Sequence, residues 1–98
     1  MAHQVSAEAG GDLDDIWLYI AEESDDPDRA DRLIRTITDR FYLLSEYPFL
    51  GRLRPDLRAD LRSFPVGNYV ILYRIDRGNV IILHVFPGMR DIASFFPE

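Results

Sequence analysis

The sequence predicts an α+β domain of two layers, in which a helical hairpin packs on a small antiparallel sheet. Two segments with the apolar spacing of amphipathic helices come early, and three apolar runs rich in β-branched and aromatic residues follow. Turn residues separate these later runs, which is typical of antiparallel strands. With a brief strand at residues 3–6 the order is βααβββ, a two-layer α+β arrangement. The 98 residues predict a single domain, 1–98.

The first helix is predicted from about Ala7 to Glu23. Its apolar side chains form one stripe, at Leu13, Ile16, Trp17 and Ile20. Ser6 is suited to the N-cap position before this segment. Two consecutive glycines, Gly10 and Gly11, would each cost about 1 kcal/mol inside a helix. We therefore expect the regular helix to begin only at Gly11 or Asp12.

The second helix is predicted from Pro27 to about Glu46. Asp26 provides an N-cap, and proline is favoured at the first helical position. The apolar spacing continues along the segment, at Ala30, Leu33, Ile34, Ile37, Phe41 and Leu44. Tyr47 precedes Pro48 and so avoids the α conformation, which ends the helix. The two helices form an αα-hairpin whose apolar stripes pack on one face of the sheet.

Three strands are predicted, at Leu61–Val66, Tyr69–Ile75 and Val80–Phe86. The last two form a hairpin around residues 76–79, Asp-Arg-Gly-Asn, where Gly and Asn accept positive φ. Side chains alternate along a strand, so each face of the hairpin carries its own set. One set is Tyr69, Ile71, Tyr73 and Ile75, and the other is Val70, Leu72 and Arg74. The same alternation predicts that His84 shares a face with Val80, Ile82 and Phe86.

Both faces of this hairpin are apolar, and the two helices can cover only one of them. An apolar face left open on a soluble monomer is typical of an interaction site. We therefore expect a partner protein to cover the second face.

Charge is uneven along the chain, which carries −6 overall at pH 7. Residues 1–28 contain nine acids and no base, whereas residues 29–62 contain eight arginines and five acids. An acidic chain argues against broad nucleic-acid binding, which needs a basic surface. The chain has no cysteine, and its two histidines are not spaced as metal ligands usually are. We therefore expect no metal or cofactor. No phosphate-binding loop, leader or membrane span is evident, so we expect a cytoplasmic protein without a small-molecule substrate.

A set of short motifs occurs in a fixed order from about Ala7 to Ile92. They are Ala9, Asp12-Leu13, Ile16-Trp17, Tyr19-Ile20, Pro48, Gly51-Arg52, Leu61-Arg62-Ser63, Tyr69 to Arg74, Val80, Ile82 to Val85, and Arg90-Asp91-Ile92. This ordered set resembles the ParE branch of the ParE/RelE toxin superfamily of bacterial toxin–antitoxin pairs. Two positions depart from the family pattern: Pro87 stands where His is frequent, and His84 stands where relatives tend to carry Arg.

The resemblance implies a toxin that inhibits DNA gyrase by binding it, without catalysis, and that a ParD-like antitoxin neutralises. It also implies contact with operator DNA only through that antitoxin. Two alternatives stay open. RelE-type relatives cleave mRNA on the ribosome, and this chemistry would use Arg62, Arg74, His84 and Arg90 as cations and acid–base groups. The chain could instead be an inactive relative retained as an antitoxin partner.

The predicted binding surface is the arginine-rich connector after the second helix. Arginine forks form bidentate bonds to carboxylates, and interleaved leucines supply apolar anchors for an acidic antitoxin segment or the target. The predicted binding residues are Arg52, Leu53, Arg54, Leu57, Arg58, Leu61, Arg62, Arg74 and Arg90. A solvated surface with weak pairing to Asp56 and Asp60 is the alternative interpretation. The second sheet face is predicted to receive a disordered antitoxin tail that folds on binding.

Overall fold

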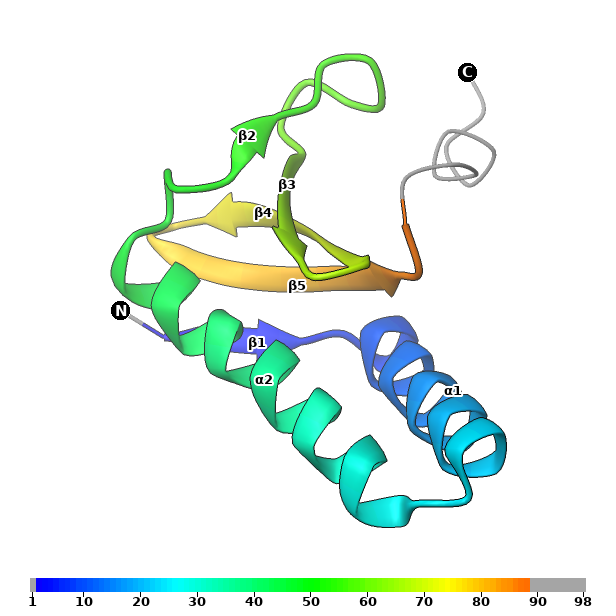
Figure 1. Ribbon diagram of the computed structural model, residues 1–98. Helices are drawn as coiled ribbons and strands as arrows, with labels where there is room; N and C mark the ends of the chain where they lie inside the picture. Colours follow the sequence, from blue (N-terminus) through cyan, green and yellow to red (C-terminus); the bar gives the residue numbers. More distant parts are fainter. Residues whose placement is uncertain (1, 89–98) are drawn as a thin grey trace.

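A computed structural model describes residues 2–88 of the chain. Its elements are β1 (His3–Val5), α1 (Ala7–Ser24), α2 (Pro27–Glu46), β2 (Arg52–Leu53), β3 (Arg62–Val66), β4 (Tyr69–Asp76) and β5 (Asn79–Phe86). The two helices form one layer and the sheet the other (Figure 1). The two-layer α+β prediction is confirmed, with β2 as an additional short strand that a two-residue pattern could not reveal.

The sheet has the order β1-β5-β4-β3-β2 and is mixed rather than antiparallel. β2, β3, β4 and β5 pair antiparallel, but β1 pairs parallel to β5, with His3 opposite Val80 and Val5 opposite Ile82. The predicted antiparallel arrangement is confirmed for β3, β4 and β5, but the sheet as a whole is mixed because of β1. No turn joins β1 to its neighbour, so hairpin geometry does not fix its direction.

Both helices start at the predicted caps. Ser6 Oγ accepts a hydrogen bond from the Ala9 N–H (3.0 Å), and the carboxylate of Asp26 accepts from the first N–H groups of α2. Ser6 also donates through Oγ to the Leu83 carbonyl (2.9 Å) and through its N–H to the Ile82 carbonyl (2.9 Å). These contacts fix the first turn of α1 on β5.

The anchored first turn explains why α1 is regular from Ala7, and the predicted later start at Gly11 or Asp12 is wrong. Tertiary hydrogen bonds offset the conformational cost of the two glycines. A Cβ added at Gly10 or Gly11 would meet no atom within 4 Å, so packing does not require glycine at either position.

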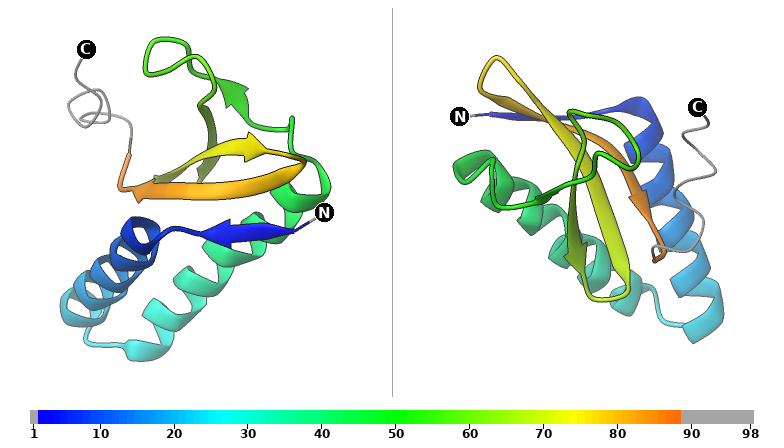
Figure 2. Two further views of the ribbon diagram at one scale, coloured as in Figure 1. Left: turned by 180° about the vertical axis from the view of Figure 1, so that it is seen from behind. Right: turned by 90° about the horizontal axis from the view of Figure 1, so that it is seen from above.

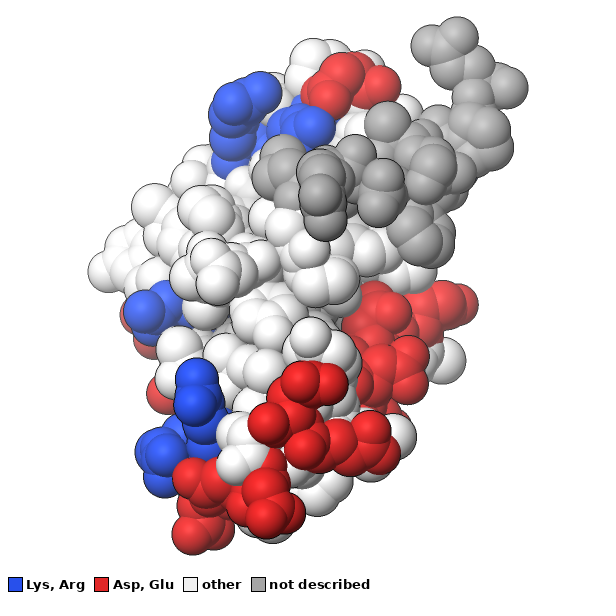
Figure 3. Space-filling view, turned by 45° about the vertical axis from the view of Figure 1, so that its right-hand side comes forward, with Lys and Arg blue, Asp and Glu red and all other residues white. Residues whose placement is uncertain are grey.

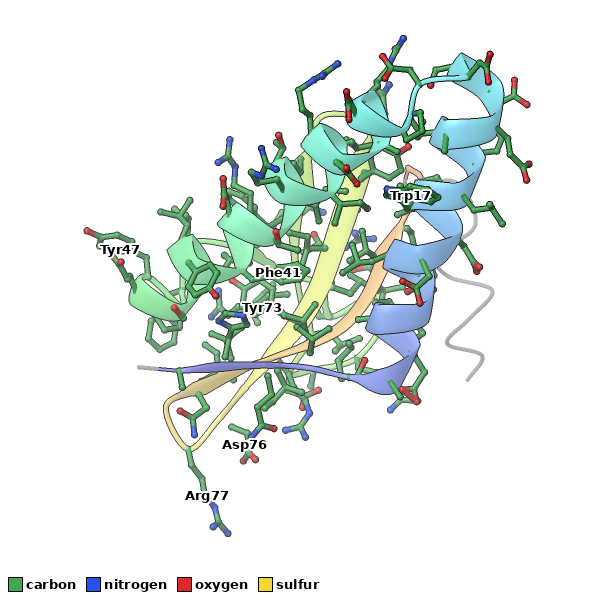
Figure 4. The ribbon with its side chains drawn as sticks, turned by 90° about the horizontal axis from the view of Figure 1, so that it is seen from below. Trp17, Phe41, Tyr47, Tyr73, Asp76 and Arg77 are labelled. Carbon is green, nitrogen blue, oxygen red and sulfur yellow. The ribbon has the colours of Figure 1, made fainter. Side chains whose placement is uncertain are left out.

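The β4–β5 hairpin turns through Arg77 and Gly78, both with positive φ (53° and 81°). This is the pattern of a two-residue hairpin loop matched to strand twist. Asn79, expected to share the positive φ, instead pairs with Asp76 as the first residue of β5. Figure 4 shows Asp76 and Arg77 at the tip of the hairpin, away from the helices.

A β-bulge interrupts β5. Tyr73 pairs with Ile82 but Leu72 pairs with His84, so Leu83 is the extra residue. An extra residue reverses the alternation of side chains beyond it. Val85 therefore joins Ile82 in the cluster under the helices. The prediction that His84 shares a face with Val80 and Ile82 is wrong: His84 lies opposite Leu72, outside the main core, with its ring against Asp12 of α1.

The main core lies between the helices and the sheet. Buried side chains of both layers meet there, at Ala9, Ile16, Ile37, Phe41, Leu44, Val66, Ile71, Tyr73, Val80, Ile82 and Val85, with Leu13, Ile20, Leu33 and Ile34 packed against them. Figure 4 shows Phe41 and Tyr73 between α2 and the sheet, and Trp17 between the helices. Trp17, predicted to pack on the sheet, instead donates its indole N–H to the Asp31 carboxylate of α2 (2.7 Å).

The second face of the sheet carries a smaller apolar cluster. Val70, Leu72 and Phe86 are only 4%, 0% and 7% exposed, and Leu57 packs against them. Leu57 belongs to the connector of residues 54–61 between β2 and β3, which crosses above the sheet (Figures 1 and 2). The expectation that this face stays open until a partner covers it is therefore wrong, because these side chains are buried in the chain alone.

One buried hydroxyl joins the end of α2 to the sheet. Tyr73 Oη donates to the Pro48 carbonyl (2.8 Å) and accepts from the Gly51 N–H (2.8 Å). A Cβ at Gly51 would lie 2.6 Å from Cε1 and 2.9 Å from Cζ of this tyrosine. Only glycine leaves room for the ring, so Gly51 and Tyr73 together fix the position of the chain just before β2.

Replacing Tyr73 by Phe keeps the packed ring but leaves the Gly51 N–H and Pro48 carbonyl without their partner. We expect Tyr73→Phe to lower the free energy of unfolding by about 1–3 kcal/mol in urea titration. Tyr42→Phe, at an exposed tyrosine on α2, is the matched control and should change it by under about 0.5 kcal/mol. Equal stability of the two variants would contradict the role of the hydroxyl.

Candidate functional site

Arg54, the buried arginine of the connector, forms its contacts within the connector. The guanidinium of Arg54 forms two bonds with the Asp56 carboxylate, Nε to Oδ1 at 3.0 Å and Nη2 to Oδ2 at 2.7 Å. Hydrogen bonding within this pair raises the pKa of Arg54 and lowers the pKa of Asp56. The Arg54 N–H also donates to the Leu61 carbonyl (2.8 Å). Arg54 therefore stabilises the connector rather than presenting its charge outward.

Three more predicted binding residues are also used inside the fold. Arg62 Nη1 donates to the Gly51 carbonyl (2.8 Å), and its guanidinium lies 5.1 Å from the ring centroid of Phe49. Leu61 is fully buried, and Leu57 packs on the second face of the sheet. Sequence analysis predicted these three residues as part of a binding surface. In the structure their side chains make contacts within the chain instead.

The outward part of the predicted surface is smaller. Arg52, Leu53 and Arg58 are exposed, and Arg74 is partly exposed with its guanidinium 3.9 Å from the Asp76 carboxylate. Leu72 lies on the second face, and Arg74 follows it by two residues on the same strand. Ser63 pairs with Leu72 and Arg52 pairs with Ser63, so both arginines lie on the second face. Arg58 lies in the connector that crosses this face. Arg90, the last predicted residue, lies outside the described residues.

Within residues 2–88, the residues proposed for RNA cleavage do not share one face of the sheet. Arg62 pairs with Tyr73 and lies on the helix face, whereas Arg74 and His84 lie on the opposite face. His84 Nδ1 lies 3.1 Å from Oδ2 of Asp12, and the same oxygen accepts the Val85 N–H (2.9 Å). A carboxylate can only accept, so Nδ1 carries the hydrogen. The described part of the set, Arg62, Arg74 and His84, offers no single centre around a phosphate.

A pocket of about 670 Å³ lies between α1 and the C-terminal half of β5. Its walls are Asp12, Asp15, Ile16 and Tyr19 from α1, Tyr69 from β4, and His84, Val85, Phe86 and Pro87. The rings of His84 and Phe86 stack, with centroids 5.0 Å apart. Burial, together with the neighbouring Tyr19, raises the pKa of Tyr69, so its hydroxyl is neutral at pH 7. This wall combines carboxylates with aromatic rings.

Sequence reasoning missed this pocket because the bulge in β5, which turns His84 and Phe86 to their positions, has no sequence signature. A partial signal was present on α1. Asp12, Ile16 and Tyr19 follow one another at helical spacing, beside the apolar stripe. Figure 3 shows acidic side chains gathered over this part of the molecule, where α1 carries acids and no base.

Two absences hold for the described part of the chain. None of the helices within residues 2–88 is long and apolar enough to cross a membrane. In the same range, no three potential metal ligands lie together.

Comparison with known proteins gives consistent results. Residues 4–92 match the family model described as the ParE toxin of the type II toxin–antitoxin system parDE. Toxin ParE3 of Caulobacter vibrioides is 37% identical over 84 residues, which cover 86% of this chain and 83% of that protein. Toxin ParE1 of the same organism is 32% identical over 74% of this chain and 75% of its own length.

Solved structures share the fold. A chain from the chromosomal ParDE toxin–antitoxin system of P. aeruginosa matches with a TM-score of 0.79 at 19% identity, covering 91% of this chain and 97% of that one. A chain from the RelBE2 toxin–antitoxin complex of Mycobacterium tuberculosis matches with a TM-score of 0.68 at 24% identity, over 88% and 95% of the two chains.

The Arg54–Asp56 pair gives the connector a pH-dependent stability. Because the pKa of Asp56 is lowered in the folded protein, its contribution is present above the unfolded pKa, about 4, and is lost as pH falls through the folded pKa. We expect Asp56→Asn to lower the urea midpoint at pH 7, with the difference from the parent protein shrinking below about pH 4. Asp60→Asn, at an exposed acid of the same connector, is the control. If Asp56→Asn lowers the urea midpoint equally at pH 7 and below about pH 4, the Arg54–Asp56 pair is not the cause of the loss.

Proposed function

Because this chain belongs to the ParE family of type II toxin–antitoxin toxins, we propose that it acts in the cytoplasm by binding DNA gyrase. It holds the gyrase–DNA intermediate in an unproductive state, and a ParD-like antitoxin neutralises it. Operator DNA is contacted only through the antitoxin. In this proposal the chain is a binding protein and not an enzyme.

The observation that carries the proposal is the family match over residues 4–92, together with relatives named ParE toxins over most of the chain. The structural neighbours come from toxin–antitoxin systems, one of them a ParDE system, which supports an antitoxin as partner. DNA gyrase as the target follows from the family resemblance.

The geometry supports binding over catalysis. An RNA-cleaving site needs cations and an acid–base pair around one phosphate. Arg62 is instead bonded to the Gly51 carbonyl, and His84 is held by Asp12 of α1. Among the described residues, these two side chains therefore stabilise different parts of the fold and do not face a common phosphate site.

The outward surface of the connector supports an acidic partner segment. Arg58 is exposed in the connector, and the adjoining edge strand β2 carries the exposed Arg52 and the half-exposed side chain of Leu53. Exposed arginines of this kind steer association and set register, while each adds little affinity on its own. We propose that the antitoxin contacts this outer surface, over a sheet face that the chain already covers.

A cell-free comparison tests the function. Purified protein should inhibit DNA supercoiling by gyrase, the antitoxin should restore supercoiling, and translation in a parallel reaction should continue unchanged. Ribosome-dependent cleavage of mRNA would contradict the proposal in favour of the endonuclease. Absence of both effects, with unimpaired bacterial growth when the chain is expressed alone, would indicate an inactive relative.

Removing the outward arginines should weaken the antitoxin complex. We expect Arg52→Ala/Arg58→Ala to reduce affinity about three- to tenfold by titration calorimetry, with a smaller effect at high salt. The control Arg40→Ala/Arg77→Asn also removes two positive charges, and Asn tolerates the positive φ of residue 77. If both pairs lose affinity equally, net charge rather than the connector surface is responsible.

A further inference from the structure

We propose that the pocket between α1 and β5 receives an arginine side chain of the antitoxin. This inference rests on the proposed function, because it names a second contact of the same partner. It concerns a different part of the molecule from the connector: the pocket lies beside α1, and the exposed arginines lie beside β2.

The size and shape of the pocket suit a long side chain. Its volume of about 670 Å³ lies within the range of sites for small molecules. Apart from Pro87, the walls come from the regular elements α1, β4 and β5, so the pocket is formed before any partner arrives. The bulge at Leu83 and the Asp12–Val85 hydrogen bond determine the position of its β5 wall.

The chemistry of the walls selects a cation. Asp12 and Asp15 provide carboxylates, and Tyr19 and Tyr69 provide ring faces. A guanidinium stacks on aromatic rings and forms charge-assisted hydrogen bonds to carboxylates at the same time, whereas a neutral side chain lacks the charge and an acidic one is repelled. No arginine lines the pocket among residues 2–88, and α1 contains no basic residue that could fill it.

Asp12 has acceptor capacity left for such a guest. Its Oδ2 takes both contacts from β5, with the Val85 N–H and with His84 Nδ1. Its side chain is 26% exposed, so a ligand in the pocket can reach the carboxylate. The two contacts within the protein hold the carboxylate in place, so binding a cation requires little ordering of that group.

The test uses the full-length protein and N-acetyl-arginine methylamide as probe, with NMR shifts of the Val85 amide and the His84 ring as readout. The control probe is N-acetyl-citrulline methylamide, which has the same shape without the charge. We expect saturable shifts with the arginine probe and about five- to tenfold weaker binding of the citrulline probe. Equal binding of the two probes would overturn the inference.

Two variants separate the pocket from general electrostatics. Asp12→Asn can still accept the Val85 N–H, and Tyr19→Leu removes only an exposed ring wall, so both should fold. Each should weaken the arginine probe about threefold or more. Asp25→Asn, at the C-cap of α1 and away from the pocket walls, removes the same charge and should leave binding unchanged. If Asp25→Asn weakens binding of the arginine probe as much as Asp12→Asn does, the inference is overturned.

The identity of the occupant is tested by competition. The antitoxin should displace the arginine probe from the pocket, whether or not gyrase is inhibited, so this result is independent of the target. If the antitoxin binds while the probe stays in place, the antitoxin is not the occupant and the inference fails. If the probe binds only to the Arg90→Gln variant, the chain's own arginine fills the pocket, which also overturns it.

Discussion

The β4–β5 hairpin is apolar on both faces, and covering both of them determines how the rest of the chain is arranged. The helical hairpin covers one face, with Phe41 and Ile37 against Ile71 and Tyr73. The connector covers the other, with Leu57 against Val70 and Leu72. The burial of apolar side chains on both sides is the main source of stability in such a small domain. The arginines and the tyrosine hydroxyl around the connector then serve to hold that second cover in place.

This arrangement changes what the arginine-rich segment means for function. An arginine such as Arg54 or Arg62, bonded within its own chain, is not available as a docking fork without first breaking those contacts. A partner can reach the side chains that are exposed, such as those of Arg52 and Arg58. In the proposed function the antitoxin therefore binds the outer side of a finished domain and adds to the fold instead of completing it. The pocket beside α1, which carries carboxylates, is the second contact that we propose on the same domain.

Sequence pattern was sufficient for the features that local chemistry determines. The caps at Ser6 and Asp26, the end of α2 before Pro48 and the two alternating faces of β4 all follow from a few neighbouring residues. The parallel pairing of β1 and the bulge at Leu83 depend on contacts between distant segments, so no local pattern announces them. The same limit applies to the site. Arg52 and Arg54 lie two residues apart in one arginine-rich segment, yet Arg52 is exposed and Arg54 is buried, because the fold of the connector determines their exposure.

Native-state hydrogen exchange of the isolated protein tests most directly whether the chain covers its own second face. Within the connector, the N–H groups of Arg54, Leu57 and Arg58 donate to backbone carbonyls at 2.8–3.1 Å. If the connector is folded onto the sheet without a partner, these amides exchange far more slowly than those of an unstructured peptide, and Leu72 of β4 is more strongly protected still. Connector amides that exchange at unprotected rates until an antitoxin is added would contradict the account.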